Sequence, residues 1–243
     1  MNNAPEKMQE FFNNRVDIYD TQQIKNIDGG EKCCQEIACH IPLHTNRLLD
    51  LGSGTGLELE SIFRKFPEVN VTCIDLADKM LEKLSEKYSA HSVHLVNDNY
   101  LTADLGKHEF DAVVSIMSFH HFTYTQKLKL YSSIFECLKP NGVFIECDYM
   151  IASNDSQLEK QYLMERQELL LNHHLPESLY HYDIPFTIDH EQSLFQQADF
   201  NWSKKCGELE ITSCFVGKNK QIIFLPNSNC CIMLIQSFIK SKL

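Results

Sequence analysis

The sequence predicts an α/β fold built on a parallel β-sheet. From residue 46 onward, short apolar runs alternate with segments whose apolar residues recur at helical spacing. A glycine-rich turn, residues 52–56, directly follows the first apolar run. Because parallel strands need a crossover connection, usually a helix, this alternation indicates βαβ units. The 243 residues suffice for one large domain.

The expected elements follow in a regular order. Strands are predicted at residues 47–51, 69–74, 92–96, 110–117 and 143–147, with helices at 57–66, 77–88 and 126–138 between them. The tetrapeptide at 139–142, Lys-Pro-Asn-Gly, predicts a turn before the fifth strand. A helix at 187–198 and a closing hairpin at 202–208 and 210–216 complete the predicted core.

Two regions lie outside this alternation. Helical spacing at 6–14 and 31–41 predicts cap helices within residues 1–45. The insertion at 151–186 combines helical spacing at 157–171 with an aromatic stretch, and such inserts overhang the carboxyl ends of strands, where ligands bind. We therefore expect one domain over residues 1–219, with a lid at 151–186. Residues 220–243 form an extension of unknown role, whose final Ser-Lys-Leu matches a peroxisomal signal.

Charge and hydropathy exclude some partners. Acidic residues number 33 against 22 Lys and Arg, a net charge of −11, and no basic patch offsets it. A charge of this sign repels phosphate backbones, so no nucleic-acid partner is expected. No apolar run reaches the roughly 18 residues of a membrane span, and the first residues lack an apolar signal region. We expect a cytoplasmic protein with no membrane partner, as a monomer or a homodimer.

The ten cysteines contain no Cys-x-x-Cys pair. Disulfides and zinc frameworks are therefore not expected, and Cys73 and Cys147, within apolar runs, are expected to behave as small buried hydrophobes. The group Cys33, Cys34 and Cys39 leaves open an alternative role as ligands of a soft metal or metalloid.

The turn after the first strand carries the main functional signal. Gly52, Gly54 and Gly56 let the backbone turn tightly and approach a ligand closely. Leu57 stands where the dinucleotide fingerprint requires its third glycine, and the lysine of a phosphate-binding loop is absent. Asp50 adds negative charge beside the loop, which favours a cationic ligand over a phosphate.

Two further strand ends add polar groups. Asp75 ends the second strand, 75 − 56 = 19 residues after the last glycine, where a carboxylate can accept both hydroxyls of a ribose. After the third strand, either Asp98 or Asn99 is placed to accept a hydrogen bond from an adenine amine, and the two alternatives stay open.

Four motifs in the same order resemble the class I S-adenosylmethionine-dependent methyltransferases, small-molecule branch. They are residues 50–56 (DLGSGTG), 74–81 (IDLADKML), 110–115 (FDAVVS) with 119–121 (FHH), and 138–143 (LKPNGV). The resemblance covers about residues 8–217. It implies a Rossmann-like sheet of seven mostly parallel strands with helices on both faces, an antiparallel last strand and a helical lid.

The resemblance also implies a cofactor and its contacts. S-adenosylmethionine would be bound and released as S-adenosylhomocysteine, with no metal. Asp50 and the glycine loop would hold the methionine end, Asp75 the ribose, Asp98 or Asn99 the adenine, and Met80 would pack on the ring. The expected cofactor contacts are Asp50, Gly52, Ser53, Gly54, Gly56, Asp75, Leu76, Met80, Asp98, Asn99, Ser115 and Met117.

The acceptor side is expected near the fourth strand and the lid. His120 and His121 follow that strand and are the candidates for a general base, with Tyr19 of the cap as the reserve. Tyr180, His181 and Tyr182 of the lid are expected to contact a small-molecule substrate. The predicted reaction is methyl transfer to an N, O, C or S atom.

Two alternative functions compete with this prediction. One is a non-catalytic module that binds S-adenosylmethionine, since a fold does not prove an activity. The other is a nucleic-acid or protein methyltransferase. The net charge opposes a nucleic-acid substrate, and the segment Ser118-Phe-His-His replaces the Asn/Asp-Pro-Pro-aromatic motif that exocyclic-amine enzymes carry at this position.

Overall fold

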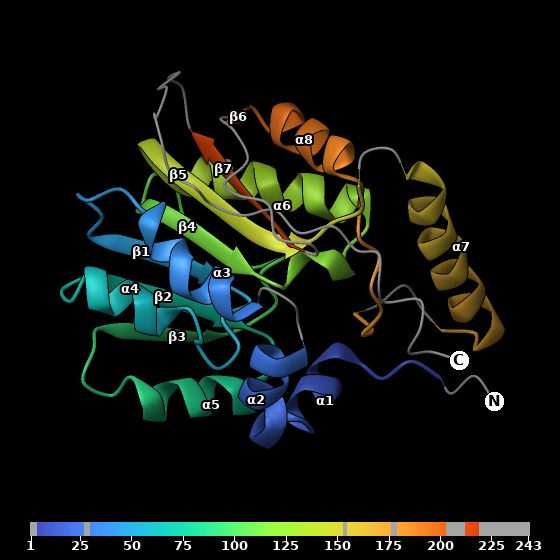
Figure 1. Ribbon diagram of the computed structural model, residues 1–243, viewed down its shortest axis with the longest axis horizontal. Helices are drawn as coiled ribbons and strands as arrows, with labels where there is room; N and C mark the ends of the chain where they lie inside the picture. Colours follow the sequence, from blue (N-terminus) through green and yellow to red (C-terminus); the bar gives the residue numbers. More distant parts are fainter. Residues whose placement is uncertain (1–3, 27–29, 153–154, 176–178, 203–211, 219–243) are drawn as a thin grey trace.

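A seven-stranded sheet forms the centre of the molecule in the computed structural model (Figure 1). Its strand order is β3-β2-β1-β4-β5-β7-β6. The structure describes residues 4–26, 30–152, 155–175, 179–202 and 212–218. The extension 220–243, with its Ser-Lys-Leu end, lies outside these residues, as do positions 203–211 of the hairpin predicted at 202–208 and 210–216.

Five parallel strands confirm the predicted sheet. They are β1 (Arg47–Leu51), β2 (Asn70–Asp75), β3 (Val93–Asn97), β4 (Phe110–Ile116) and β5 (Leu138–Tyr149). β7 (Thr212–Lys218) pairs antiparallel with β5, and β6 (Asn201–Trp202) pairs antiparallel with β7. Because β1 and β4 are neighbours whose crossovers run in opposite directions, their carboxyl ends form the crevice where ligands of open α/β sheets bind.

Helices cover both faces of the sheet. Side chains of α4 (Leu59–Lys65) and α5 (Asp78–Lys87) pack with Leu48, Val71 and Ala112 on one face. On the other face, α6 (Tyr124–Cys137) and α8 (Ile188–Gln197) pack with Leu49, Val113 and Phe144. The strands alternate apolar residues between the two faces, as a sheet buried on both sides requires.

Four short helices precede β1. They are α1 (Met8–Asn13), α2 (Val16–Asn26), α3 (Gly30–Glu36) and the 3-10 turn η1 (Ile37–Cys39). The predicted helix at 31–41 therefore ends earlier and continues as η1. Hydrophobic spacing does not predict helix α2, because its sequence, VDIYDTQQIKN, has no apolar stripe at helical spacing.

The prediction of a turn at 139–142 before the fifth strand is wrong, because these residues lie within β5. Helix α6 passes directly into β5, which already pairs with β4 at Leu138. The pairing then jumps from Phe110–Leu138 to Ala112–Val143, so residues 139–142 form a bulge within the strand. Asn141, at φ 68°, takes the left-handed conformation that the bulge requires.

The segment between β5 and α8 carries one long helix, α7 (Ser156–Asn172), at the edge of the molecule (Figure 1). After it, the chain at Tyr180 forms an antiparallel bridge with Lys7 of the N-terminal cap. The amide of His181 donates to the Glu6 carbonyl at 3.0 Å, and the amide of Met8 donates to the Leu179 carbonyl at 2.9 Å. The lid segment and the first cap helix are thus joined over the sheet.

Two further observations concern the chain as a whole. In the described part of the chain, no helix is both long and apolar enough to span a membrane. Cys33 of α3 and Cys147 of β5 are joined as a disulfide, which contradicts the expectation that Cys147 is a free thiol. The two residues are 114 positions apart and meet only through tertiary packing. Cys73 is a free, fully buried thiol, as expected.

Candidate active site

The glycine loop forms a tight turn at the carboxyl end of β1. Gly52, Gly54 and Gly56 have φ values of 73°, 50° and 72°, which favour glycine. The Gly52 amide donates to the Ile74 carbonyl at 2.8 Å, which ties the loop to β2. A Cβ at Gly52 would lie 2.0 Å from the Ser118 hydroxyl, so the loop also approaches the segment after β4 too closely for any side chain.

Asp50 lies beneath this loop as a fully buried carboxyl. Neither of its oxygens has a hydrogen-bond partner among the described residues, and the Ser53 hydroxyl nearby is also unpartnered. Burial and the adjacent Glu58 carboxyl raise the pKa of Asp50 well above its usual range. Burial likewise raises the pKa of Glu58. Two adjacent buried acids are suited to binding a cation.

A cavity of about 160 Å³ opens above the loop, between it and the N-terminal cap. The cap contributes Tyr19 and Cys34 to its wall. Tyr19 lies over the loop, since a Cβ at Gly54 would be 3.6 Å from its ring. Burial, followed by the nearby Asp75 and Glu58, raises the pKa of the Tyr19 hydroxyl. The remaining wall residues from the sequence prediction are Gly52, Ser53 and Met117.

Ionic contacts hold the cap over the loop. Asp20, next to Tyr19, accepts a hydrogen bond from the Thr55 hydroxyl at 2.5 Å. Lys87 of α5 pairs with Asp20 at 2.6 Å and donates to the Thr55 carbonyl at 3.0 Å. The cap helix α2 is therefore fastened to the glycine loop by charged contacts rather than by an apolar stripe.

Asp75 ends β2 beside the loop. Its carboxylate accepts hydrogen bonds from the Gly54 and Ala77 amides, both at 2.8 Å. Burial raises the pKa of Asp75 despite these bonds. Each carboxylate oxygen has a second lone pair, so the group can still accept from a ligand hydroxyl.

After β3, both Asp98 and Asn99 remain candidates for the adenine contact. Asp98 is exposed, and its carboxylate accepts from the Asn99 amide at 2.7 Å. Asn99 is half-buried, and its side-chain oxygen accepts from the Leu101 amide at 3.0 Å. Asn97 donates to the carbonyls of Asp75 and Leu76, which joins the ends of β2 and β3.

The other predicted cofactor residues have different surroundings. Leu76 is half-buried and packs against the core on the α6 side. Met80 is buried on α5, and Ser115 donates its hydroxyl to the Leu51 carbonyl at 2.9 Å within the sheet. Met117, at φ 53°, leaves β4 in a left-handed conformation and reaches the cavity wall. Ser115 and Met80 thus belong to the core around the loop.

The two predicted histidines form the next part of the site, in η2 (Phe119–His121). Asp148, near the end of β5, accepts from the Phe119 and His120 amides at 2.7 and 2.8 Å and contacts His120 Nδ1 at 2.5 Å. Burial alone would lower the pKa of His120, but the Asp148 carboxylate outweighs it and raises the pKa. One buried acid thus fixes both the turn and the imidazole.

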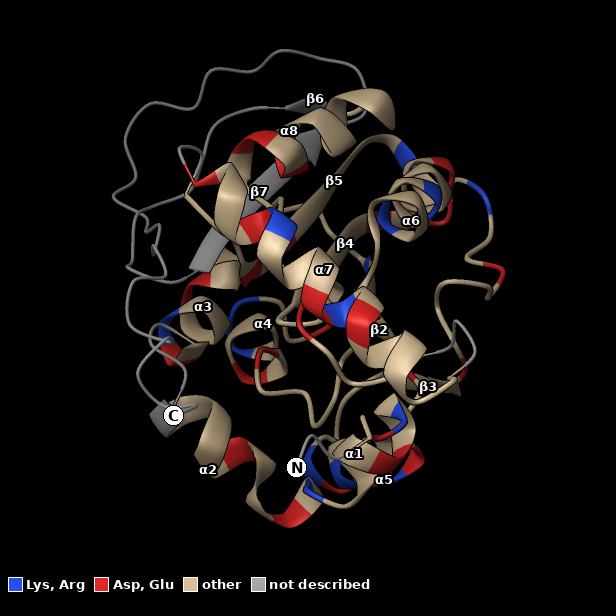
Figure 2. Cartoon of the chain, turned by 90° about the vertical axis from the view of Figure 1, so that its right-hand side faces the viewer, with Lys and Arg blue, Asp and Glu red and all other residues tan. Residues whose placement is uncertain are grey.

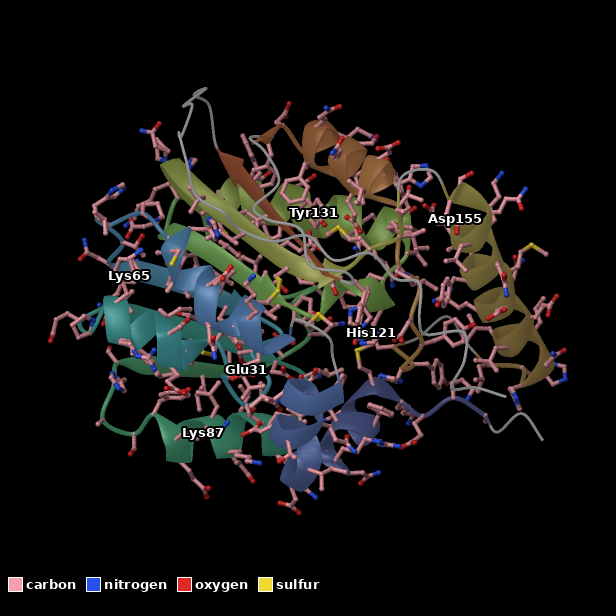
Figure 3. All side chains as sticks on the ribbon, viewed as in Figure 1. Glu31, Lys65, Lys87, His121, Tyr131 and Asp155 are labelled. Atoms are coloured by element: carbon pink, nitrogen blue, oxygen red, sulfur yellow. A yellow bond between two sulfur atoms is a disulfide. The ribbon has the colours of Figure 1, made fainter. Side chains whose placement is uncertain are left out.

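His121 faces the lid at the centre of Figure 3. Its Nδ1 lies 3.3 Å from Asp183 Oδ1 and 3.3 Å from the Tyr182 carbonyl. Burial and the neighbouring His120 lower the pKa of His121. Asp183 lies 3.7 Å from His120 Nε2 as well, so this single lid carboxylate faces both imidazoles.

The three predicted lid residues do not share one environment. His181 stacks on Phe11 of α1, with ring centroids 3.4 Å apart, and its ring lies 4.9 Å from that of His121. Burial and His121 lower the pKa of His181 to about 3. Tyr182 donates its hydroxyl to Glu165 of α7 at 3.1 Å. Tyr180 and Tyr182 line a small hollow with His121 and Arg166.

Three acidic residues of this site were not predicted from the sequence. Glu58 follows the glycine loop closely, and an acid there could have been recognised as a partner of Asp50. Asp148 lies one residue beyond the predicted end of the fifth strand. Asp183 lies within the aromatic lid stretch, but nothing in its local sequence indicates that it faces His121.

Comparisons with known proteins agree with this geometry. Residues 48–142 match a family model described as a methyltransferase domain. An uncharacterized methyltransferase of Mycobacterium tuberculosis is 31% identical over 86 residues, 35% of this chain and 43% of that protein. A malonyl-acyl-carrier-protein O-methyltransferase of Priestia megaterium is 24% identical over 137 residues, 56% of this chain and 48% of that protein. The chain thus spans less than half the length of these relatives.

Solved structures share the fold. An O-methyltransferase family protein from Burkholderia thailandensis superposes with a TM-score of 0.65 at 12% identity, covering 84% of this chain and 59% of that chain. Human N-acetylserotonin methyltransferase, in complex with S-adenosylmethionine, superposes with a TM-score of 0.58 at 12% identity, covering 88% and 56%. Residues 48–142 thus match a methyltransferase domain, and the motifs, sheet order and relatives together support a class I S-adenosylmethionine-dependent methyltransferase.

Proposed function

We propose that this chain transfers the methyl group of S-adenosylmethionine to a small-molecule acceptor. The observation that carries the proposal is the buried Asp50 carboxyl, unpartnered among the described residues, beneath a glycine loop that opens into a cavity. An unpaired buried acid is costly, and a ligand with a cationic ammonium group would relieve that cost. S-adenosylmethionine carries such an ammonium on its methionine end.

Glu58 lines the cavity, and other residues at the ends of β1, β2 and β3 fit the rest of that cofactor. Asp50 and Glu58 would hold the ammonium, and Asp75 would accept from the ribose hydroxyls. Leu76 offers an apolar contact for the adenine, and Asp98 or Asn99 a polar one. When bound, the sulfonium supplies an activated methyl group, so the protein's main task is to align the acceptor with it. Such positioning can contribute on the order of 7–11 kcal/mol.

The acceptor would lie between η2 and the lid. His120 and His121 face this space from the sheet, and the segment 179–183 faces it from above. The lid would exclude water through its bridge to the cap at Lys7 and Tyr180. Tyr19, which covers the glycine loop, would act on the cofactor side, because its ring lies over Gly54 and not beside the histidines. The O-methyltransferase family protein among the structural neighbours supports an oxygen atom as the methyl acceptor.

A thermal shift assay tests the cofactor. The purified chain is heated with S-adenosylmethionine, S-adenosylhomocysteine or NAD in separate wells, and the Asp75→Ala variant is treated identically. A ligand at about 100 times its Kd stabilises by about 2.7 kcal/mol, which raises Tm by several degrees at this chain length. We expect a shift with both sulfur nucleosides, its loss in Asp75→Ala and its retention in Glu68→Ala, an exposed acid remote from the loop.

A second assay separates an enzyme from a binding module. The chain is incubated with S-adenosylmethionine and a panel of small hydroxyl, amine and thiol compounds, and formation of S-adenosylhomocysteine is measured. Turnover with any acceptor supports the proposal. A shift with NAD alone would mean that the glycine loop binds a different nucleotide, and the methyl-transfer proposal would be withdrawn.

A further inference from the structure

We propose that His120, His121 and Asp183 bind a divalent transition metal ion, of which Zn²⁺ is the best match. We call these three residues the His–Asp cluster. One ligand atom from each lies within 4.8 Å of the others, and both histidines are buried. The inference deepens the proposed function and depends on it for the role of the metal, although metal binding itself can be tested separately.

The distances fit a small metal centre. Tetrahedral zinc has metal–nitrogen bonds of about 2.0–2.1 Å, so its ligand atoms lie about 3.3 Å from one another. Asp183 Oδ1 is 3.3 Å from His121 Nδ1 and 3.7 Å from His120 Nε2. The two imidazole nitrogens lie within 4.8 Å of each other and would approach the same spacing when all three atoms bind one ion.

Asp148 orients the first ligand. Its carboxylate contacts His120 Nδ1 at 2.5 Å, which assigns the proton to that nitrogen and leaves the Nε2 lone pair directed toward Asp183. A carboxylate on the outer nitrogen of a ligating histidine is the usual second contact in zinc sites, because it fixes the ring and raises its basicity.

The surroundings of Asp183 Oδ1 are the second observation in favour of a bound cation. This oxygen is buried, and apart from its contacts with the two imidazoles at 3.3 and 3.7 Å it has no hydrogen-bond partner in the part of the chain that the structure describes. The backbone around it is well held, since the Ile184 amide donates to the His120 carbonyl at 2.7 Å. The lid strand is therefore fastened to η2 at the position that directs Asp183 toward both imidazoles.

Three protein ligands are the number that catalytic zinc sites use. Two histidines and one carboxylate leave a fourth position for water or substrate, and zinc lowers the pKa of a group bound there. The metal would therefore favour an acceptor with a hydroxyl group and would replace a histidine as the group that activates it. This proposal replaces the expectation that the site holds no metal.

The experiment measures zinc in the full chain. After treatment with EDTA, the protein is equilibrated with Zn²⁺, passed through gel filtration and analysed by inductively coupled plasma mass spectrometry. We expect one zinc per chain, lost in His121→Gln and Asp183→Asn and retained in His44→Gln, an exposed histidine away from the cluster. Asp148→Asn should weaken zinc affinity by about 10–100-fold, because it removes only the orienting contact.

Cobalt distinguishes this cluster from the cysteines. With Co²⁺ in place of zinc, nitrogen and oxygen ligands give visible d–d bands, whereas thiolate ligands add a strong charge-transfer band in the near ultraviolet. Visible bands without the thiolate band support the proposal even if a ligand variant fails to fold. A thiolate band, no retained zinc, or equal zinc in wild type and Asp183→Asn would overturn it. The cofactor shift is read separately, so a failed metal site and a failed cofactor assignment give different results.

Discussion

Single residues of the glycine loop carry the most specific information about this protein. Position 52 requires glycine for two reasons. Its φ is positive, and the Ser118 hydroxyl occupies the space that a Cβ would need. Asp50 is buried, and its carboxyl oxygens have no hydrogen-bond partner among the described residues. A buried carboxyl of this kind does not stabilise the folded chain by itself. Such a group is informative because a bound cation would favour its charged form.

The first residue prediction concerns Gly52→Ala. A side chain there meets both the left-handed backbone and Ser118, so we expect a loss of more than about 2 kcal/mol and loss of the cofactor-induced shift. Gly106→Ala is the matched control, because Gly106 also has positive φ, 76°, but lies away from the loop and its Cβ would first meet the movable end of Glu109. It should lose only about 1–2 kcal/mol and keep the shift. Thermal unfolding with and without S-adenosylmethionine measures both effects.

The second residue prediction concerns pH and Asp50. Burial and Glu58 raise the pKa of Asp50, so the folded chain binds a proton that an unfolded Asp releases above about pH 3.9. This contribution to stability is present at low pH and is lost as pH rises. Asp50→Asn cannot ionise, so its Tm should fall less than that of wild type between about pH 5 and pH 8. An equal decrease of Tm with pH in Asp50→Asn and wild type would contradict a buried, protonated carboxyl. The exposed Asp104→Asn variant should show the same dependence of Tm on pH as wild type.

Among the elements, β5 is the one that joins the core to the site. Its Glu146 and Asp148 point to the same face, because side chains alternate along a strand. Asp148 holds η2, while Glu146 lies in a fully buried group with Lys127 of α6 and Glu191 of α8. The Tyr131 hydroxyl contacts both glutamates. The helices on this face are thus fixed to β5 by charges as well as by apolar packing.

The prediction at this scale is that Lys127 is essential for stability. Lys127 pairs with Glu191 and lies 3.6 Å from Glu146, with all three side chains fully buried. Lys127→Met would remove the cationic partner of the buried Glu191, which costs about 3–5 kcal/mol. Lys129→Met, an exposed change on the same helix, should remain within about 0.5 kcal/mol of wild type. Denaturant unfolding of the two variants gives the comparison.

Glu146 should respond differently from its neighbours. Burial, opposed by Lys127, raises the pKa of Glu146 to about 8, so it is mostly protonated at neutral pH. Glu146→Gln imitates that neutral form, and we expect a smaller loss of stability than for Lys127→Met in the same unfolding measurement. An equal loss in both variants would mean that Glu146 is charged in the folded protein.

The molecule as a whole carries a net charge of −11. Acidic and basic residues alternate along α7 rather than forming a basic face (Figure 2). Binding to nucleic acid depends on neutralising phosphates, so we expect no measurable retention of RNA in a filter assay at physiological salt. A basic RNA-binding protein serves as the positive control. Tight, salt-sensitive binding would instead favour a nucleic-acid acceptor.

Much of the sheet was predictable from local sequence. The apolar runs placed the first four parallel strands within one residue at each end, because each run is bounded by polar or glycine-rich turns, whereas β5 begins five residues before its predicted start. Helix α2 was missed since charged contacts of Asp20 and Lys87 hold it, not an apolar stripe. The sequence predicts a turn at 139–142 where the structure has a bulge, because Pro-Asn-Gly is typical of turns and of bulges alike.

The sequence by itself determined the βαβ order, the glycine loop and the strand-end acids Asp50 and Asp75, because each depends on residues close together in the chain. Only the tertiary structure decided the partners of the histidines. Asp148 meets His120 from 28 residues away, and Asp183 meets His121 from the lid. These contacts have no local pattern. They arise because β5 pairs beside β4 and the lid segment is hydrogen-bonded across η2, which brings distant carboxylates to one place.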